Sequence, residues 1–321
     1  MNAIVINAYG GPEALTHKDM PIPTPGPDEA LVRMTAIGVN FIDIYQRMGL
    51  YPGTLPFIAG NEGAGRVEAI APGTSGASVG DRVAFWNVRG AYAGYVVAPV
   101  DKLVKVPNDI DDQTAAAVLL QGMTAHYLTR STYALRKGDA ALVHAAAGGV
   151  GLLLTQMAHR IGARVFGTVS TDEKAALARE AGADEVILYT RQDFETEVKR
   201  LTSNAGVHVV YDSVGKTTFE KGLDCLRPRG MMVSYGQSSG KAPAIEPLRL
   251  VKGSLFLTRP TLVDYVATPE ELRTRADDVF GMIERGELHV RIGHVYKLAD
   301  AAQAHRDLEA RKTTGKLILV P

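Results

Sequence analysis

The sequence has a single cysteine, Cys225, among its 321 residues. One thiol excludes an intramolecular disulfide and every zinc site that needs two or more thiolate ligands. Basic and acidic residues number 35 each, so the formal net charge is zero and no surface for nucleic acid or an acidic membrane is indicated. No apolar run reaches about 18 residues, and the N-terminus lacks a basic segment followed by a hydrophobic one. We therefore expect a cytoplasmic protein whose partners are small molecules and copies of itself.

Hydrophobic residues make up 46% of the chain and charged residues 22%, which is typical of an ordered globular protein. The length suggests two domains, each with its own core. Residues 1 to about 122 are rich in short apolar segments separated by Gly and Pro turn signals. The strands predicted there are 2–8, 29–38, 65–70, 81–86, 93–98 and 102–105. Many short strands at close spacing indicate a small, barrel-like β domain.

From residue 114 the pattern becomes helical, with helices expected at 114–120 and 122–128, and from 140 strands and helices alternate. The expected strands are 140–145, 163–169, 185–189, 207–212, 230–235 and 254–258, and the expected helices are 150–161, 172–180, 193–202 and 216–226. Gly162 and Gly182 lie where helix C-caps belong, and Ser170 with Glu173 has capping-box spacing. Parallel strands need such crossover helices, so this half is predicted to be a doubly wound sheet.

The last part of the chain begins with a clear helix start, in which Thr268 is the N-cap, Pro269 is N1 and Glu271 is N3. A second helix is expected at 300–310, followed by an apolar strand at 316–320. Because no helix follows that strand, we expect it to return to the first domain. The predicted domains are therefore 1–123, completed by 263–321, and 124–262.

The segment 140–151 runs from an apolar strand through small residues into an apolar helix. In that setting small residues let the backbone approach a pyrophosphate, and the helix N-terminus offers N–H groups and a positive dipole end. The G-x-G-x-x-G register falls on Ala146, Gly148 and Gly151, so alanine holds the first place. Alone the pattern indicates only a tight turn, but the strand and helix units after it favour a dinucleotide site.

Residues near the expected adenine ribose favour NADPH over NADH. An NAD site has an acidic residue at the tip of the next strand. Here the strand ends without one, and Asp172 already opens the helix. The hydroxyls of Ser170 and Tyr189, with the cations Lys174 and Arg191, would bind a 2′-phosphate. The alternative is that both cations are solvated surface charges.

Several segments together resemble the zinc-independent, zeta-crystallin-like quinone oxidoreductases of the medium-chain dehydrogenase/reductase family. The matching segments are GVNFID at 38–43, YQR at 45–47, YP at 51–52, PFIAGNEGAG at 56–65, VGDRV at 79–83, QGMTA at 121–125, the glycine stretch, YDSVG at 211–215 and RPRG at 227–230. The resemblance spans essentially the whole chain. It implies an α/β fold with a GroES-like β-rich catalytic domain and a Rossmann doubly wound nucleotide-binding domain, with NADPH bound between them.

The zinc alcohol dehydrogenases carry Cys where this chain has Asn40, and His where it has Asn61. Because these residue types do not suit zinc, we expect no metal. Without a Lewis acid to polarise oxygen, alcohol oxidation loses its main driving force, and an acceptor that takes hydride unaided is favoured. The first hypothesis is an NADPH:quinone oxidoreductase without metal or flavin. The alternatives are an NADPH-dependent reductase of α,β-unsaturated carbonyls and a non-catalytic, crystallin-like NADPH-binding protein.

The resemblance also implies site residues. Those expected near the nicotinamide and acceptor are Asn40, Asp43, Tyr45, Arg47 and Tyr51. Those expected to bind cofactor are Thr124, Gly148, Gly149, Val150, Gly151, Ser170, Lys174, Tyr189, Arg191, Ser213, Gly236, Gln237, Ser238, Phe256, Leu257, Arg311 and Lys316. The tyrosines could instead be ordinary half-buried side chains, Asp43 and Arg47 could pair with each other at i, i+4 spacing, and Phe256 could be core packing.

Three further expectations concern two single residues and one strand. His144, on the central strand, is expected to be a buried neutral histidine rather than a catalytic base. Cys225 is expected to be a partly buried thiol without function. The apolar strand 254–258 is expected at the edge of the sheet, and unpaired edges invite pairing. In the family this strand pairs across a two-fold axis, which implies a homodimer.

Overall fold

A computed structural model describes all of residues 1–321. The chain forms two compact units, Met1–Leu120 with Val266–Pro321, and Gln121–Tyr265. The predicted divisions, after 123 and 262, lie close to these. The chain passes from the first unit to the second within helix α2 (Asp112–Tyr127). No helix combines the length and the apolar character needed to cross a bilayer.

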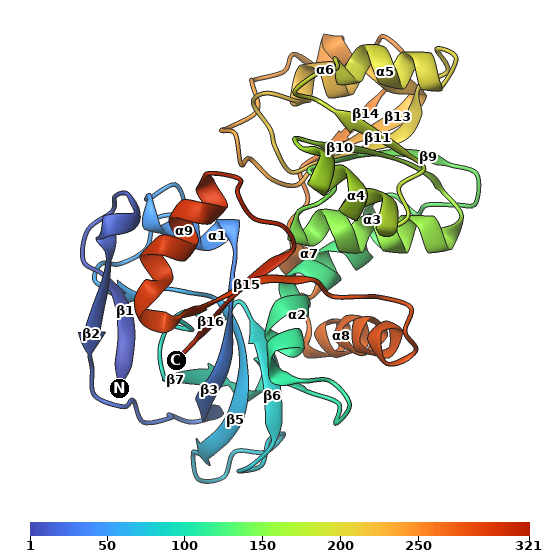
Figure 1. Cartoon of the computed structure of the whole chain (residues 1–321). Coiled ribbons are helices and arrows are strands. Elements are labelled where there is room, and N and C mark those ends of the chain that lie inside the picture. The colour runs from blue at the N-terminus through green and yellow to red at the C-terminus, as the bar shows by residue number, and fades with distance from the viewer. The chain divides into compact units, whose positions relative to one another are not determined.

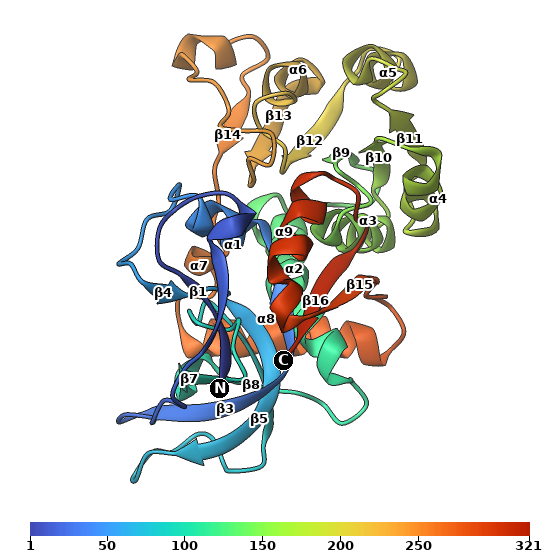
Figure 2. The ribbon, with the colours of Figure 1, turned by 60° about the vertical axis from the view of Figure 1, so that its left-hand side comes forward.

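The first unit is built on a seven-stranded sheet of order β15-β16-β3-β5-β6-β8, with β7 also paired to β3, and a three-stranded sheet of order β2-β1-β4. Figure 2 labels all of these strands except β2 and β6. Its strands are β1 (Asn2–Ile6), β2 (Leu15–Asp19), β3 (Glu29–Val39), β4 (Phe57–Ile58), β5 (Glu62–Ile70), β6 (Arg82–Trp86), β7 (Tyr95–Pro99), β8 (Val104–Lys105), β15 (Ile292–Lys297) and β16 (Lys316–Val320). The closing strand β16 pairs antiparallel with β3, opposite Val39, so the C-terminal segment belongs to this unit. The apolar strand faces share one core with residues of α9.

The helices of the first unit are α1 (Phe41–Arg47), α8 (Pro269–Glu284) and α9 (Ala301–Glu309). The predicted start of α8 is confirmed, since Thr268 and Glu271 form a capping box and Pro269 opens the helix. Short 3-10 turns of this unit lie at Pro12–Ala14, Val100–Lys102 and Leu298–Asp300, and a fourth, Pro247–Leu250, belongs to the second unit. The turn at Leu298–Asp300 leads directly into α9, whose predicted range was one residue longer at each end.

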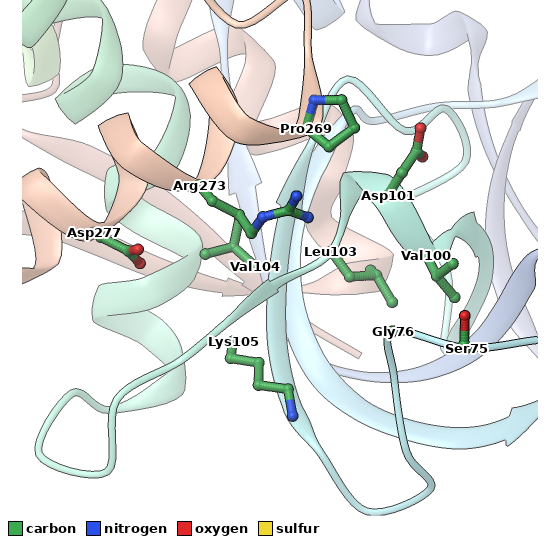
Figure 3. A pocket seen from close by; sticks show the side chains of 10 residues that line it. All are labelled: Ser75, Gly76, Val100, Asp101, Leu103, Val104, Lys105, Pro269, Arg273 and Asp277. Atoms are coloured by element: carbon green, nitrogen blue, oxygen red, sulfur yellow. The ribbon is translucent and has the colours of Figure 1, made fainter.

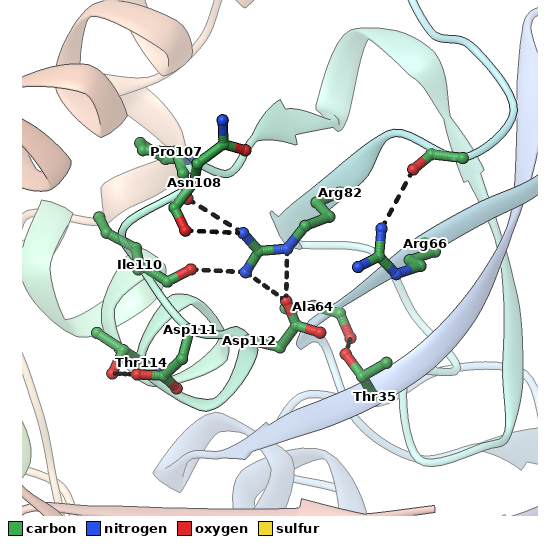
Figure 4. A network of polar contacts seen from close by, with 11 residues as sticks. Thr35, Ala64, Arg66, Arg82, Pro107, Asn108, Ile110, Asp111, Asp112 and Thr114 are labelled. Carbon is green, nitrogen blue, oxygen red and sulfur yellow. Dashed lines mark hydrogen bonds and ion pairs between the residues drawn. The ribbon is translucent and has the colours of Figure 1, made fainter.

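Arg82 ties strand β6 to the turn that begins α2 (Figure 4). Its guanidinium donates to Asp112 Oδ1 at 2.7 Å and to the carbonyls of Ile110 at 2.6 Å and Pro107 at 3.2 Å. Asp111 then caps the helix by accepting the N–H of Thr114 at 2.9 Å. The start of α2 is thus held by the β domain, because these bonds satisfy carbonyls and N–H groups that the turn leaves unpaired.

The second unit is a six-stranded parallel sheet of order β11-β10-β9-β12-β13-β14, the Rossmann order, with α3 and α4 on one face and α5 and α6 on the other (Figure 1). Its strands are β9 (Ala140–His144), β10 (Arg164–Val169), β11 (Glu185–Leu188), β12 (Val207–Asp212), β13 (Leu226–Ser234) and β14 (Phe256–Thr258). Its helices are α3 (Gly149–Ile161), α4 (Asp172–Glu180), α5 (Phe194–Leu201), α6 (Phe219–Asp224) and α7 (Leu262–Tyr265), with a π-helical turn at Leu128–Thr132. The predicted doubly wound sheet is confirmed.

Three local predictions were wrong. The two helices expected at 114–120 and 122–128 are one helix, α2, because glycine in a helix costs only about 1 kcal/mol and Gly122 is packed among buried residues. The N-cap of α4 is Thr171, not Ser170; its side chain accepts the N–H of Lys174. The helix expected at 216–226 is shorter, since Leu226 already pairs with Val207 as the first residue of β13.

Candidate active site

A buried ion pair lies beside the start of α1 in the first unit. Lys316 and Glu62 are only 1% and 0% exposed, and the Lys316 ammonium lies 2.5 Å from Glu62 Oε2. The ammonium also donates to Asn40 Oδ1 at 2.7 Å, while the Asn40 amide donates to Glu62 Oε2 at 2.8 Å. The other carboxylate oxygen accepts the N–H of Leu120 at 2.7 Å. Every polar group of this trio therefore has a partner, as burial requires.

Strand pairing places the lysine over the glutamate. Leu317 pairs with Val39, which sets Lys316 beside Asn40 at the end of β3. A Cβ on Gly38 would come within 2.5 Å of Glu62 Oε2 and 2.9 Å of Lys316 Cε, so only glycine fits there. Lys316, which was expected to contact cofactor, therefore has its charge neutralised by Glu62 inside the β domain.

Asp43 forms a second buried acidic centre, 2% exposed, on α1. Its Oδ1 accepts from Asn61 at 2.7 Å, and its Oδ2 accepts the N–H of Asn40 at 2.8 Å and the hydroxyl of Tyr92 at 3.1 Å. Burial raises the pKa of Asp43 to about 6, against the opposing effect of these hydrogen bonds. Asn61 also donates to Gln46 at 2.8 Å, so two turns of α1 are held to the strand that begins at Glu62.

Asp43 does not pair with Arg47, the alternative that their i, i+4 spacing left open. Arg47 instead pairs with Glu309 at 2.7 Å and 3.1 Å and contacts His305 Nδ1 at 3.2 Å. The guanidinium only donates, so Nδ1 accepts and the proton of the neutral ring is on Nε2. That nitrogen lies 3.0 Å from the Tyr92 oxygen, whose own hydrogen goes to Asp43. Each hydrogen bond along this chain of side chains is therefore donated in the direction from Arg47 toward Asp43. Burial lowers the pKa of His305 to about 3, and the neighbouring Arg47 charge adds to the effect.

The contributions of Asp43 and His305 to the free energy of unfolding change in opposite directions with pH between about pH 4 and pH 6. Folded Asp43 binds its proton more tightly than the unfolded chain, so its contribution falls as pH rises from 3.8 to about 6. Folded His305 binds its proton more weakly, so its contribution rises with pH from about 3 to 6.5. We expect Asp43→Asn to make the free energy of unfolding fall more steeply on acidification, by up to about 1.4 kcal/mol per pH unit.

Urea unfolding at pH 4.5, 5.0, 5.5 and 6.0 measures these slopes. His305→Gln is the matched variant, since Gln can still accept from Arg47 and donate to Tyr92, and it should shift the slope the other way. If both variants shifted the slope in the same direction, the assignment of the two groups would be wrong.

The two tyrosines of the predicted site lie at the end of α1 and just beyond it. Tyr45 is 9% and Tyr51 41% exposed, and their rings meet edge to face with centroids 5.5 Å apart. Neither is an ordinary half-buried tyrosine, because Tyr45 is buried beneath the ring of Tyr51 and Tyr51 is exposed to solvent. Three of the residues expected near the acceptor, Asn40, Asp43 and Arg47, are buried in the hydrogen-bonded network.

The glycine stretch of the second unit forms the predicted strand, turn and helix. A Cβ on Gly151 would lie 2.2 Å from the carbonyl oxygen of Ala145, and one on Gly149 would lie 2.1 Å from the side chain of Gln121. Gly148 is the N-cap of α3, and the N–H groups of the first turn, from Gly149 on, have no acceptor four residues back within the helix. Bare backbone with forward-pointing N–H groups fits a pyrophosphate.

The residues expected at the 2′-phosphate lie on two turns joined to each other. Thr190 donates to the carbonyl of Ser170 at 3.0 Å, and Arg191 pairs with Asp172 at 2.8 Å. The ion pair is nonetheless exposed, 64% and 63%, so it contributes little and leaves the guanidinium able to take a second anion. Lys174 lies in the first turn of α4.

The remaining predicted residues of the cofactor site are spread over four places. Thr124 is buried in α2. Ser213 follows β12, and its carbonyl accepts the N–H of Ser238 at 3.1 Å. A Cβ on Gly236 would lie 2.5 Å from the same carbonyl oxygen. The loop that contains Gln237 therefore packs directly against the end of β12. Phe256 and Leu257 are on β14, where Phe256 is 55% exposed and is therefore not core packing. Arg311 is exposed beyond α9, in the first unit.

His144 is a buried neutral histidine, as predicted, although Thr168 Oγ1 at 2.9 Å holds its Nδ1 rather than backbone. Burial lowers its pKa. Cys225 is fully rather than partly buried, and burial raises its pKa to about 12, which leaves it unreactive.

A groove of about 490 Å³ opens on the first unit between the β8 region and α8 (Figure 3). Arg273 and Asp277 of α8 face it together with Lys105 and Asp101. Lys105 pairs with Asp81 at 3.1 Å, and none of the predicted cofactor or acceptor residues lines the groove. Its mixed charges indicate no particular ligand.

Two family models match the chain: an alcohol dehydrogenase GroES-like domain over residues 26–108, and a zinc-binding dehydrogenase over 149–277. The residues of this chain do not fit the zinc that the second description implies. Asn40 and Asn61 are amides engaged in hydrogen bonds, and Glu62 is paired with the Lys316 ammonium. No group of three or more His, Cys, Asp or Glu side chains that could hold a metal ion occurs in the structure.

Relatives match the chain over its whole length. A quinone oxidoreductase from Pseudomonas aeruginosa is 50% identical, covering 98% of both chains, and a 2-haloacrylate reductase from a Burkholderia species is 42% identical, covering 99% of this chain and 98% of its own. The solved structure of Escherichia coli quinone oxidoreductase complexed with NADPH is 41% identical, with a TM-score of 0.98 and full coverage of both chains. The chain therefore belongs to the quinone oxidoreductase family of the medium-chain dehydrogenase/reductases.

Proposed function

We propose that this chain is an NADPH-dependent quinone oxidoreductase that works without metal or flavin. The observation that carries the proposal is the trio of Asn40, Glu62 and Lys316, in which an ammonium neutralises the buried carboxylate. That ammonium is fully engaged inside the β domain, and an amide and a salt-bridged carboxylate are poor ligands for a Lewis acid that would polarise an alcohol oxygen. A quinone accepts hydride without such help. The names of the Pseudomonas and Escherichia relatives support the same substrate class.

NADPH, when bound, supplies the hydride. In the proposal the unit Gln121–Tyr265 is the cofactor domain, where Gly148 to Gly151 hold the pyrophosphate by backbone N–H groups. Ser170, Lys174, Tyr189 and Arg191 bind the 2′-phosphate, with Arg191 shared between it and Asp172. The residues proposed for the nicotinamide half are Thr124, Ser213, Gly236, Gln237, Ser238, Phe256 and Leu257, and Arg311 is proposed as a further cofactor contact.

The unit Met1–Leu120 with Val266–Pro321 is proposed as the catalytic domain. Tyr51 presents its ring to a flat acceptor, and Tyr45 supports that ring from below. Asn40, Asp43 and Arg47 orient α1 through the buried network rather than contact the acceptor. Because a hydroquinone oxygen is a weak base, positioning supplies most of the rate.

Oxidation of NADPH, followed spectroscopically with benzoquinone, phenanthrenequinone and a simple enone, tests the proposal. We expect turnover with the quinones, and a preference for NADPH over NADH that falls by about tenfold or more in Lys174→Ala. The NADH affinity of that variant should be unchanged and is its internal control. Tight NADPH binding without turnover of any acceptor would overturn the proposed activity, and equal cofactor preference in both proteins would remove the phosphate site.

A second candidate is reduction of an activated carbon–carbon double bond. It is favoured by the 42% identity with a 2-haloacrylate reductase. The same assay decides between quinone reduction and double-bond reduction, since faster turnover of the enone than of either quinone would favour double-bond reduction.

We also propose a homodimer formed through β14. This strand is at the edge of the Rossmann sheet and is paired only with β13. Its first residue, Phe256, is 55% exposed, and Val251 and Leu248, which precede it in the chain, are 68% and 75% exposed. An apolar, unpaired edge favours association. Light scattering should give twice the chain mass for wild type and less for Phe256→Glu; a monomeric wild type would contradict this. The expected cytoplasmic location stays a prediction.

A further inference from the structure

Tyr9, which lies just beyond β1, fixes the far end of the segment that carries Tyr51. Its hydroxyl accepts the N–H of Gly53 at 2.8 Å and donates to the carbonyl of the same residue at 2.6 Å. One side chain thus satisfies both backbone polar groups of Gly53. The Tyr9 hydroxyl therefore holds the C-terminal end of residues 48–53, called the acceptor segment below.

The ring of Tyr9 covers the other end of the acceptor segment. Gly49 has a φ of +74°, and a Cβ there would lie 2.9 Å from Tyr9 Cγ. Tyr9 is itself fixed, because its neighbour Gly10 donates to the Arg47 carbonyl at 3.1 Å and accepts from Arg47 Nε at 3.2 Å. Arg47 is part of the buried network, so the position of Tyr9 follows from the same bonds that orient α1.

Between these two ends the acceptor segment exposes apolar side chains. Met48, Leu50 and Tyr51 are 49%, 42% and 41% exposed. The N–H groups of Leu50 and Tyr51 both go to the carbonyl of Tyr45, at 2.8 Å and 3.3 Å. A segment held in one conformation while it leaves its apolar side chains uncovered is built to present them to a ligand.

We propose that Tyr9 is a positioning residue that makes the enzyme selective for large, flat acceptors by fixing the acceptor segment. The inference rests on the proposed function, in which Tyr51 meets the acceptor. A large aromatic ring needs Leu50 and Tyr51 in register, whereas a single-ring acceptor uses less of that surface. Loss of the Tyr9 hydroxyl frees Gly53 and weakens binding of the large acceptor more than of the small one.

Steady-state kinetics of Tyr9→Phe test this with phenanthrenequinone and benzoquinone as probes. The KM for phenanthrenequinone should rise about fivefold from the loss of two hydrogen bonds, and that for benzoquinone by less than half as much. The kcat values and the Kd for NADPH should stay at the wild-type level. The matched control is Tyr296→Phe, which also loses one tyrosine hydroxyl bond, to Asp307 at 2.9 Å, in the same unit. Its KM values should not change.

A double variant, Tyr9→Phe with Tyr51→Ala, removes the ring that meets the acceptor and keeps the idea falsifiable. If Tyr9 acts through the acceptor segment, its effect on the KM for phenanthrenequinone should shrink when Tyr51 is already altered. Equal KM changes for both quinones, or a lower melting temperature with unchanged KM, would overturn the role of Tyr9. Failure of the wild-type protein to reduce any quinone would instead overturn the proposed function.

Discussion

Replacing Lys316 by Met is expected to lower the free energy of unfolding by about 3–5 kcal/mol, the largest stability loss we predict for a single side chain. The change removes the ammonium but leaves the Glu62 carboxylate fully buried and without its countercharge. Asn40 would also lose the donor to its Oδ1. Urea denaturation at pH 7, followed by circular dichroism, measures the loss.

The double variant Lys316→Met with Glu62→Gln separates the charge from the packing. The introduced glutamine side chain still offers an oxygen to the N–H of Leu120, and its amide can donate to Asn40 Oδ1 once the Asn40 amide turns. We expect the double variant to recover most of the stability, because removing both partners of a buried pair costs far less than removing one. A double variant no more stable than Lys316→Met would show that the pair does not act through its charge.

Gly151→Ala is expected to lower NADPH affinity by about 100-fold, the largest effect on binding that we predict. Its Cβ would lie 2.2 Å from the Ala145 carbonyl and 2.9 Å from Ala146 backbone atoms. Backbone cannot rotate away from such a contact, so the N-terminus of α3 must shift relative to β9. The unfolding free energy should fall as well, by about 1–3 kcal/mol. Fluorescence titration with NADPH measures the affinity.

The neighbouring glycines provide graded controls for this variant. A Cβ on Gly148 would lie 3.2 Å from the Ala145 carbonyl, against 2.2 Å for one on Gly151, so Gly148→Ala should lower affinity less than Gly151→Ala. A Cβ on Gly149 would meet only the flexible end of the Gln121 side chain, at 2.1 Å. The NADPH affinity lost in Gly149→Ala should therefore be restored when Gln121→Ala is made in the same chain. If all three alanine variants bound NADPH equally, backbone contact would not be what requires glycine at 151.

The sequence predicts best those elements whose signals are local. The ranges 172–180, 207–212 and 316–320 agree with α4, β12 and β16 residue for residue, because caps or continuous apolar runs mark their ends. Strands β2 and β15 were not predicted. Their residues are mostly exposed, so neither shows the alternation of apolar and polar side chains that identifies a half-buried strand.

The candidate site is less predictable, since its key contacts join residues far apart in the chain. Lys316 meets Glu62 across 254 positions, and Arg47 meets Glu309 across 262. A lysine at the start of a strand looks like a surface charge until the pairing of β16 with β3 is known. His305, Tyr92 and Glu309 were missed for the same reason. The only local indication of the ion pair was that two apolar strands, β5 and β16, each begin with a charged residue, Glu62 and Lys316.

Because the first unit is built from both ends of the chain, it can complete its folding only after the second unit has been synthesised. During synthesis the strands β1 to β8 leave the ribosome first, the whole Rossmann unit follows, and β16 comes last. Until then β3 lacks one of its neighbours, and Glu62 remains without its cation while the unit after it is already complete. The nucleotide-binding unit can thus assemble as an independent body, whereas the β domain closes only when the end of the chain returns to it.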